Sequence, residues 1–310
     1  MIEKHVSVLL NESISSLNLK ENSIIVDATL GYGGHSSSIL DRIKKGYLFA
    51  FDQDSEAIRH STDRLSKVGT NFTIIKSNFV HMKEELSKLG IEHVDGVLFD
   101  LGVSSPQLDE SERGFSFHED APLDMRMDRE QTLSAYEVVN EYSKEDLTRI
   151  FLKYGEDKFS SNIAKKIVEY RENKKIESTL ELVEIIKTAV PMKYRLEKHP
   201  ARQIFQAIRI EVNHELDVLE PALNQALDLI NVGGRVCVIT FHSLEDRIVK
   251  NLFKEKCEID PKVKGLPNIP IEYQPHFKLV VNKAITPSDE ELEINPRARS
   301  SKLRVIEKIR

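Results

Sequence analysis

Short apolar runs alternate with amphipathic stretches along the first hundred residues. The apolar runs predict strands at residues 23–28, 47–51, 72–76 and 94–101. Between them, residues 34–45 and 55–67 are expected to be helices, since apolar side chains such as those of Ile39, Leu40 and Ile43 recur on one face. Repeated strand–helix–strand units are typical of an α/β protein with a parallel sheet.

A long interval separates the fourth predicted strand from the next, at residues 235–241. It exceeds a hundred residues, whereas a crossover ordinarily needs about thirty. The interval is helical in period, with capping patterns that begin at Ser143 and Ser178 and carry an acid three residues on. We therefore expect an inserted all-helical subdomain.

After the insertion, the pattern returns to the sheet. Residues 203–230 are expected to be helical, with a bend or restart near Pro221. Two final strands, residues 277–282 and 302–309, are expected to form a hairpin at the sheet edge.

Composition narrows the class of protein. Hydrophobic residues make up 40% of the chain and charged residues 30%, as in soluble globular proteins, and no apolar run approaches the ~20 residues that span a bilayer. The start, MIEKHVSVLL, does not resemble an export signal, so we expect a cytoplasmic protein. Neither Cys237 nor Cys257 belongs to a metal-binding cluster, so we expect no metal site and no disulfide framework.

The formal net charge of −6 argues against indiscriminate binding of nucleic acid, but two local runs are basic. One holds Lys193, Arg195, Lys198, Arg202 and Arg209, and the other holds Arg297, Arg299, Lys302, Arg304, Lys308 and Arg310. Taken alone, such runs are more often a solvated surface than a binding site.

A glycine-rich turn follows the first predicted strand, in IIVDATLGYGGHS. Its glycines lie where backbone must pass close to a ligand, between a strand and a helix. A dinucleotide-binding turn would need a sixth-position glycine, where this chain has Ser36. The spacing of Asp27, Gly31 and Gly33 instead resembles the first motif of Rossmann-like methyltransferases. A purely structural tight turn is the alternative.

Three further residues follow strand ends at the ligand-binding edge of the sheet. Asp52 can accept hydrogen bonds from both ribose hydroxyls of an adenosine, whereas the helix-capping role there suits Asp54 or Ser55 better. Phe79 can stack on adenine or belong to the core, and the sequence does not distinguish these roles. Asp100 can accept a hydrogen bond from a substrate amine, or it is structural.

The segment after Asp100 departs from a common pattern. Methyltransferases that act on exocyclic amines often have two prolines and an aromatic there, but this chain has Leu101, Gly102 and Val103. Near the fifth strand, His242 and Ser243 face the same edge. We expect them to begin a helix, with Ser243 as the cap, rather than to act as a catalytic pair.

Eight segments, spread in order over nearly the whole chain, carry a family resemblance. They are HVSVLLNE, DATLGYGGHS, DLGVSSPQLD, RGFSF, PLDMRMD, FQAIRIEVNHEL, ITFHSLEDRIVK and NPRARSSKLR. Together they resemble the ribosomal RNA small subunit methyltransferase H family, also called MraW. The resemblance implies methyl transfer from S-adenosyl-L-methionine to the ring-attached amine of a cytosine in the decoding region of small-subunit (16S) ribosomal RNA.

The resemblance also implies a fold and a site. The fold is a Rossmann-like class I methyltransferase sheet, residues 1–110 and 203–310, interrupted by a helical substrate-recognition domain, residues 111–202. The implied cofactor contacts are Gly33, Gly34, His35, Asp52, Phe79, Asp100 and Gln107. Asp100 is the candidate acceptor for the amine.

The resemblance requires an RNA site, which changes the interpretation of the basic runs. The candidate RNA-binding residues are Arg113, Lys193, Arg195, Arg202, Arg297, Arg299 and Lys302, with ribosomal RNA or the assembled small subunit as partner. No membrane and no obligatory protein partner are expected.

Two rival functions remain open from sequence. A nucleotide-dependent oxidoreductase shares the strand, the glycine turn and the ribose acid, but Ser36 and the absence of a hydride-chemistry cluster count against it. A catalytically silent RNA-binding protein could share the fold, but the intact glycines, Asp52 and Asp100 count against that.

Overall fold

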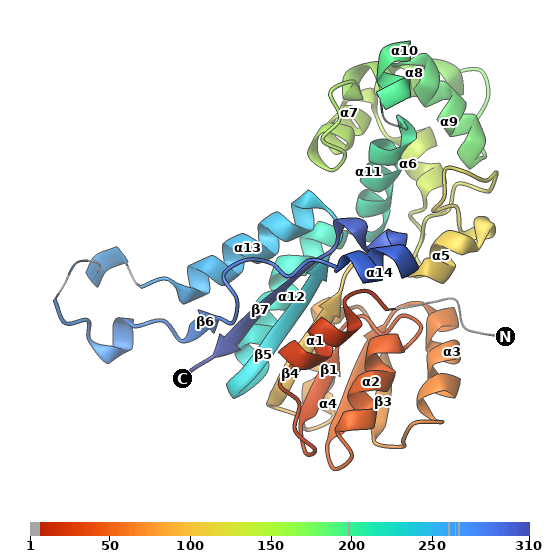
Figure 1. Cartoon of the computed structure of the whole chain (residues 1–310). Helices are drawn as coiled ribbons and strands as arrows, with labels where there is room; N and C mark the ends of the chain where they lie inside the picture. The colour runs from red at the N-terminus through yellow and green to blue at the C-terminus, as the bar shows by residue number, and fades with distance from the viewer. Residues whose placement is uncertain (1–6, 198, 260, 264, 266) are drawn as a thin grey trace. The chain divides into compact units, whose positions relative to one another are not determined.

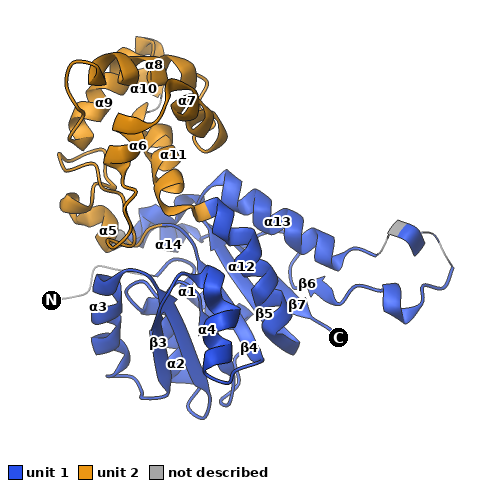
Figure 2. Cartoon of the chain, turned by 180° about the vertical axis from the view of Figure 1, so that it is seen from behind, with its two compact units in different colours: residues 1–102, 216–310 blue, residues 103–215 orange. Residues whose placement is uncertain are grey.

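The computed structural model describes residues 7–197, 199–259, 261–263, 265 and 267–310. The start of the first motif, at His5 and Val6, and Lys198 of the first basic run lie outside the described residues. The chain divides into two compact units, one made of residues 1–102 and 216–310 and the other of residues 103–215, coloured blue and orange in Figure 2. None of the described helices is long and apolar enough to cross a membrane.

The first unit is built on a seven-stranded sheet in the order β3-β2-β1-β4-β5-β7-β6 (Figure 1). The strands are β1 (Ile24–Asp27), β2 (Tyr47–Asp52), β3 (Phe72–Lys76), β4 (Val94–Asp100), β5 (Ile230–Thr240), β6 (Phe277–Leu279) and β7 (Lys302–Lys308). The first five pair in parallel, and β7 pairs antiparallel with both β5 and β6. This confirms the predicted Rossmann-like methyltransferase sheet.

Helices cover both faces of this sheet. Successive strand residues point to opposite sides, and apolar side chains on both sides are buried by helices. Ile25 packs in one core with α1 (Leu10–Ser16), α2 (Gly34–Arg42) and α3 (Ser55–Leu65). Its neighbour Val26 packs in the other core with α4 (Met82–Lys88), α12 (Glu215–Leu229) and α13 (Ser243–Cys257). The parallel strands are therefore buried on both faces, and their carboxyl ends share one edge of the sheet.

Five smaller elements complete the connections of this unit. They are the helix α14 (Asp289–Ile294) and the 3₁₀ turns η1 (Phe79–His81), η3 (Pro261–Val263), η4 (Ile271–Tyr273) and η5 (Pro296–Ser300).

The second unit is helical. It contains α5 (Ser105–Asp109), the 3₁₀ turn η2 (Ser111–Arg113), α6 (Ala135–Glu141), α7 (Lys144–Lys153), α8 (Ser160–Arg171), α9 (Thr179–Thr188), α10 (Met192–Glu197) and α11 (Ala201–Asn213). Ser143 and Ser178 accept hydrogen bonds from the backbone N–H groups of Asp146 and Glu181, so both predicted capping patterns are confirmed. The two units meet along the chain at residues 102–103 and 215–216, whereas the expected insertion ran from 111 to 202.

Two predictions about the return to the sheet were wrong in detail. The helix breaks at His214, which adopts a left-handed conformation (φ 52°), and continues through Pro221 inside α12. Strand β5 begins at Ile230, five residues before the expected start, because Ile230 pairs with Val94 ahead of a register shift.

Candidate active site

The glycine turn links the end of β1 to the start of α2. Gly31 (φ 49°) and Gly33 (φ 75°) are left-handed, a conformation that side chains disfavour. Ser61 Oγ donates to the Gly31 carbonyl at 2.6 Å, and the Gly31 N–H donates to Asp52 Oδ2 at 2.8 Å. A Cβ on Gly34 would lie 1.9 Å from Ser7 Oγ. The turn is thus fixed by its neighbours on several sides.

Asp52 ends β2 beside this turn. Its second oxygen accepts from the Asp54 N–H at 2.8 Å. Of the two expected candidates for the cap of α3, Asp54 and Ser55, it is Asp54 that caps the helix. Burial raises the pKa of Asp52 to about 6, even though these backbone N–H groups favour the ionised form. A half-buried carboxylate at this edge suits hydroxyl donors.

Phe79 follows β3 in the turn η1. Its ring meets Phe99 edge to face, with centroids 5.6 Å apart. It is half-buried and packs against the core, so its structural role is evident. The remaining exposed part of the ring leaves stacking on a base available as well.

Asp100 ends β4 next to β1. Its backbone N–H donates to Thr29 Oγ1 at 2.6 Å. Its Oδ2 lies 3.4 Å from Nδ1 of His35, which is in the first turn of α2. Its Oδ1 is buried, and among the described residues it has no hydrogen-bond partner. A buried acceptor left open in this way costs free energy and invites a donor from a ligand.

Asp27 supports the same edge from β1. Its carboxylate accepts from Ser36 Oγ at 2.6 Å and from the Thr29 N–H at 3.1 Å. Burial raises its pKa, against the lowering effect of the Ser36 hydrogen bond and of His35. The hydrogen bond from Ser36 to Asp27 was not predicted from the sequence, where Ser36 marked only the absence of a sixth-position glycine.

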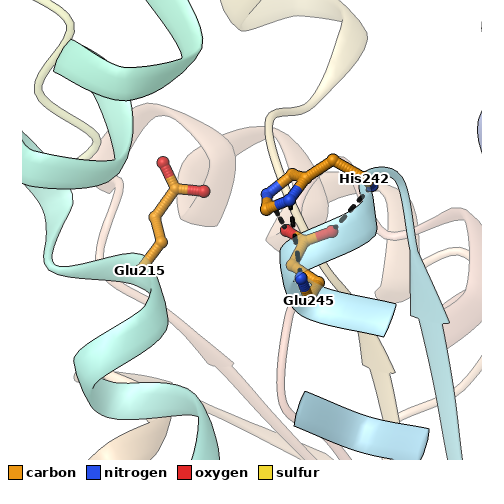
Figure 3. A group of neighbouring side chains, drawn as sticks. All are labelled: Glu215, His242 and Glu245. Atoms are coloured by element: carbon orange, nitrogen blue, oxygen red, sulfur yellow. Dashed lines mark hydrogen bonds and ion pairs between the residues drawn. The ribbon is translucent and has the colours of Figure 1, made fainter. Parts of the chain in front are cut away.

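His242 and Glu245 begin α13 (Figure 3). Glu245 Oε2 accepts from the Phe241 N–H at 2.8 Å and from the His242 N–H at 3.3 Å, and His242 Nδ1 accepts from the Glu245 N–H. The cap is therefore His242 and not Ser243, because it is the imidazole that reaches the first turn. Glu215, also drawn, belongs to the helical unit, where it pairs with Arg209 at 2.8 Å.

In the helical unit, Gln107 and Arg113 are both engaged. Gln107 is buried, and its carbonyl oxygen accepts from the Ser104 N–H at 3.0 Å in a capping box of α5. Arg113 is 1% exposed and donates to the carbonyls of Arg126 and Met127. This burial argues against the predicted phosphate contact of Arg113.

The other predicted RNA-binding residues differ in their availability. Lys193, Arg202, Arg297 and Arg299 are exposed. Arg195 is half-buried, with Nε donating to the Val190 carbonyl. Lys302 is 44% exposed, but its ammonium pairs with Asp246 at 3.0 Å, and Arg304 binds the same carboxylate.

The model of the MraW methylase family matches residues 2–309. The chain belongs to the MraW methylase family. It is therefore a methyltransferase. A relative named ribosomal RNA small subunit methyltransferase H, from Exiguobacterium sibiricum, is 56% identical over 308 residues, which cover 99% of both chains.

Two solved structures illustrate the more distant likenesses. An rRNA methylase from Streptococcus thermophilus aligns with a TM-score of 0.46 at 14% identity, over 99% of each chain. A SAM-dependent O-methyltransferase from Thermotoga maritima aligns with a TM-score of 0.42 at 9% identity, over 99% of this chain and 69% of the other. The fold is defined by the strand order itself.

Two MraW-like motifs are structural in this chain. In PLDMRMD, Asp124 binds Arg126, and Met125 is left-handed (φ 59°). Asn213, from FQAIRIEVNHEL, donates to the Met125 carbonyl and accepts from the Met127 N–H at 2.8 Å in each case. These motifs hold one loop of the helical unit in place.

Proposed function

We propose that this methyltransferase transfers a methyl group from S-adenosylmethionine to the exocyclic amine of a cytosine in the decoding region of 16S ribosomal RNA. Membership of the MraW family and the name of the 56% identical relative support ribosomal RNA as substrate. The observation that carries the proposal is Asp100 Oδ1, a buried acceptor with no partner among the described residues. This oxygen lies at the carboxyl ends of the parallel strands, which is where open parallel sheets usually bind their ligands.

The residues at this edge fit the proposed cofactor. Gly33, Gly34 and His35 form a turn in which Cβ atoms on either glycine would meet a serine hydroxyl at 3.1 Å or less. Asp52 would accept from the ribose hydroxyls, and Phe79 would flank the adenine. From the helical unit, Gln107 is proposed as a further cofactor contact. The bound cofactor supplies an electrophilic methyl group on a positively charged sulfur.

The protein's main chemical task is alignment, because such a methyl group needs little activation. The lone pair of a cytosine amine is delocalised into the ring, so the amine is a poor nucleophile. Asp100 Oδ1 would accept one amine hydrogen and favour a nitrogen with a localised lone pair. The proton released after transfer passes to solvent.

We propose the helical unit as the substrate-recognition domain. Lys193 and Arg202 are exposed on it, and the first unit adds Arg297 and Arg299. Phosphate contacts from such residues would orient the RNA, while the target cytosine would leave its stack to reach the cofactor. We assign Lys302 a smaller share because Asp246 offsets its charge.

One assay tests substrate, reaction and cofactor together. The protein is incubated with labelled S-adenosylmethionine and unmodified small subunits, or with free 16S RNA, and the labelled nucleoside is mapped. We expect N4-methylcytosine in the decoding region. Label at another nucleoside, or none, would overturn the proposal.

Asp100→Asn tests the proposed acceptor. We expect the methylation rate to fall by roughly 100-fold, since positioned proton acceptors contribute factors of this order. Cofactor affinity is measured separately by calorimetry. Asp228→Asn, at an exposed surface carboxylate paired with Lys83, is the control. Full activity with unchanged cofactor affinity in Asp100→Asn would remove Asp100 from the mechanism.

A further inference from the structure

We propose that His35 is a positioning residue, held as an imidazolium that fixes one oxygen of Asp100 and leaves the other free to accept from the ligand. This inference rests on the proposed role of Asp100 in methyl transfer. The positioning role belongs to the imidazole of His35. The proposed cofactor contact belongs to the glycine turn that ends at His35.

The two ring nitrogens of His35 face acceptors. Nε2 lies 3.1 Å from the carbonyl oxygen of Val8, which can only accept, so Nε2 must carry a proton. Nδ1 lies 3.4 Å from Asp100 Oδ2. If Nδ1 carried only its lone pair, that lone pair would face a carboxylate oxygen. A proton on Nδ1 turns this repulsion into an ion pair.

The surroundings favour the charged ring. His35 is 5% exposed, and burial by itself lowers its pKa. The hydrogen bond to Asp100, and the charges of Asp100 and Asp27, act in the opposite direction and outweigh burial, so the pKa of His35 is raised. Asp100 thus contacts the imidazole directly, and the charge of Asp27, at the end of β1, adds to its effect.

The pair makes the two Asp100 oxygens different. Oδ2 faces the imidazolium, while buried Oδ1 has no hydrogen-bond partner among the described residues. The hydroxyl of Thr29 accepts from the Asp100 N–H and fixes the backbone of Asp100. The contact with His35 restrains rotation of the Asp100 carboxylate. The acceptor is therefore oriented before any ligand arrives, which is how a positioning residue lowers the barrier to transfer.

The far side of the imidazole is also fixed. Val8, whose carbonyl binds Nε2, is followed by Leu9, whose N–H donates to Glu291 Oε1 at 2.7 Å. Glu291 lies in α14, whose cap Ser288 binds the Glu291 N–H. His35 thus links two fixed groups: the Val8 carbonyl contacts one ring nitrogen, and the Asp100 carboxylate contacts the other.

Nitrogen NMR of the histidine rings tests the ion pair without any turnover. In the wild-type protein at neutral pH, we expect both His35 nitrogens to be protonated, and the ring to lose its proton only above the ordinary histidine range. In Asp100→Asn, His35 should titrate at lower pH. A His35 that is neutral at pH 7 in the wild type, or a titration that Asp100→Asn leaves unchanged, would overturn the inference even if ribosomal RNA proved not to be the substrate.

The pH dependence of methylation tests the positioning role. Wild-type kcat should fall on the alkaline side as His35 loses its proton. We expect His35→Phe to lower kcat roughly 10- to 100-fold, a loss typical of misplaced reacting groups, and to abolish the alkaline fall. His35→Gln, which keeps one N–H donor, should recover part of kcat without restoring the alkaline fall.

His81→Gln is the matched control, because His81 also faces a carboxylate, Glu84 at 3.9 Å, but on the surface. It should keep the wild-type pH profile. If the His35 variants lose activity by the same factor at every pH and retain the alkaline fall, His35 is structural and the positioning role is refuted. Should His35→Phe fail to fold, His35→Gln and the NMR titration still decide.

Discussion

Gly33 caps α2 in a left-handed conformation, and a Cβ there would lie 3.1 Å from Ser61 Oγ. Gly33→Ala should therefore lower the free energy of unfolding by about 1–2 kcal/mol and weaken cofactor binding. Gly90→Ala is the control, since Gly90 has nearly the same φ (74°) but open space around it. Urea unfolding should show a loss of stability in both variants, larger in Gly33→Ala because of the Ser61 contact, and calorimetry should show weaker cofactor binding only in Gly33→Ala. Equal cofactor affinities would contradict the assigned turn.

Asp52 gives a prediction in pH. The pKa of Asp52 is about 6 in the folded protein, against an ordinary value of 3.8 for an aspartate, so the folded state holds this proton to higher pH than the unfolded chain. The contribution of Asp52 to stability therefore falls as pH rises from about 4 to about 6, by at most about 3 kcal/mol, and is constant above. Asp52→Asn should remove this dependence.

The measurement is urea unfolding of wild type and Asp52→Asn at pH 5 and pH 7. The wild type should lose stability relative to the variant between the two values. Parallel profiles would mean that Asp52 is not perturbed. Cofactor binding should show the opposite trend and improve with pH in the wild type, because the ionised carboxylate is the better acceptor for ribose hydroxyls.

At the scale of elements, the capping box at the start of α13 depends on one buried carboxylate. Glu245 is 2% exposed and accepts from the N–H groups of Phe241 and His242. Glu245→Ala would remove the acceptor of two partly buried N–H groups, so we expect a loss of about 2 kcal/mol in unfolding free energy. Glu258→Ala, exposed at the other end of the same helix, should stay within about 0.5 kcal/mol of wild type. Equal stabilities would exclude the capping role.

Element prediction succeeded where the signal was local. Both ends of the strand at residues 72–76 were predicted correctly, because the polar residues on either side of an apolar run mark where the strand begins and ends. The start of β5 was missed because Asn231, Val232 and Gly233 are exposed, and nothing local marks them as strand. The break at His214 was missed because a left-handed histidine has no sequence signature. The break was predicted near Pro221 instead, because proline usually interrupts a helix.

The candidate site could be predicted in part for the same reason. Strand ends indicated that Asp52 and Asp100 lie at one sheet edge, since parallel strands share that edge. The ion pair between His35 and Asp100, and the hydrogen bond from Ser36 to Asp27, depend on the packing of α2 against β1 and β4. Such side-chain pairing between elements leaves no periodic pattern. The burial of Arg113 was hidden in the same way.

At the scale of the whole molecule, an acidic chain with exposed basic residues should bind RNA through those residues alone. Lys193→Glu with Arg202→Glu should lower kcat/KM for ribosomal RNA roughly tenfold and weaken its salt dependence, while cofactor affinity stays unchanged. Lys165→Glu with Lys166→Glu makes the same change of formal charge on α8, where both lysines pair with Glu169. An equal effect of the two pairs would mean that net charge, rather than this surface, governs RNA binding.

The position of β7 in the sheet has a consequence for synthesis on the ribosome. Residues 103–215 form a continuous stretch, so the helical unit can fold as soon as that stretch has emerged. The sheet cannot, because β7, translated after every other strand, lies between β5 and β6. Until Lys302–Lys308 leave the exit tunnel, β5 presents an open apolar edge, and this nascent intermediate is the form most exposed to aggregation and to chaperones.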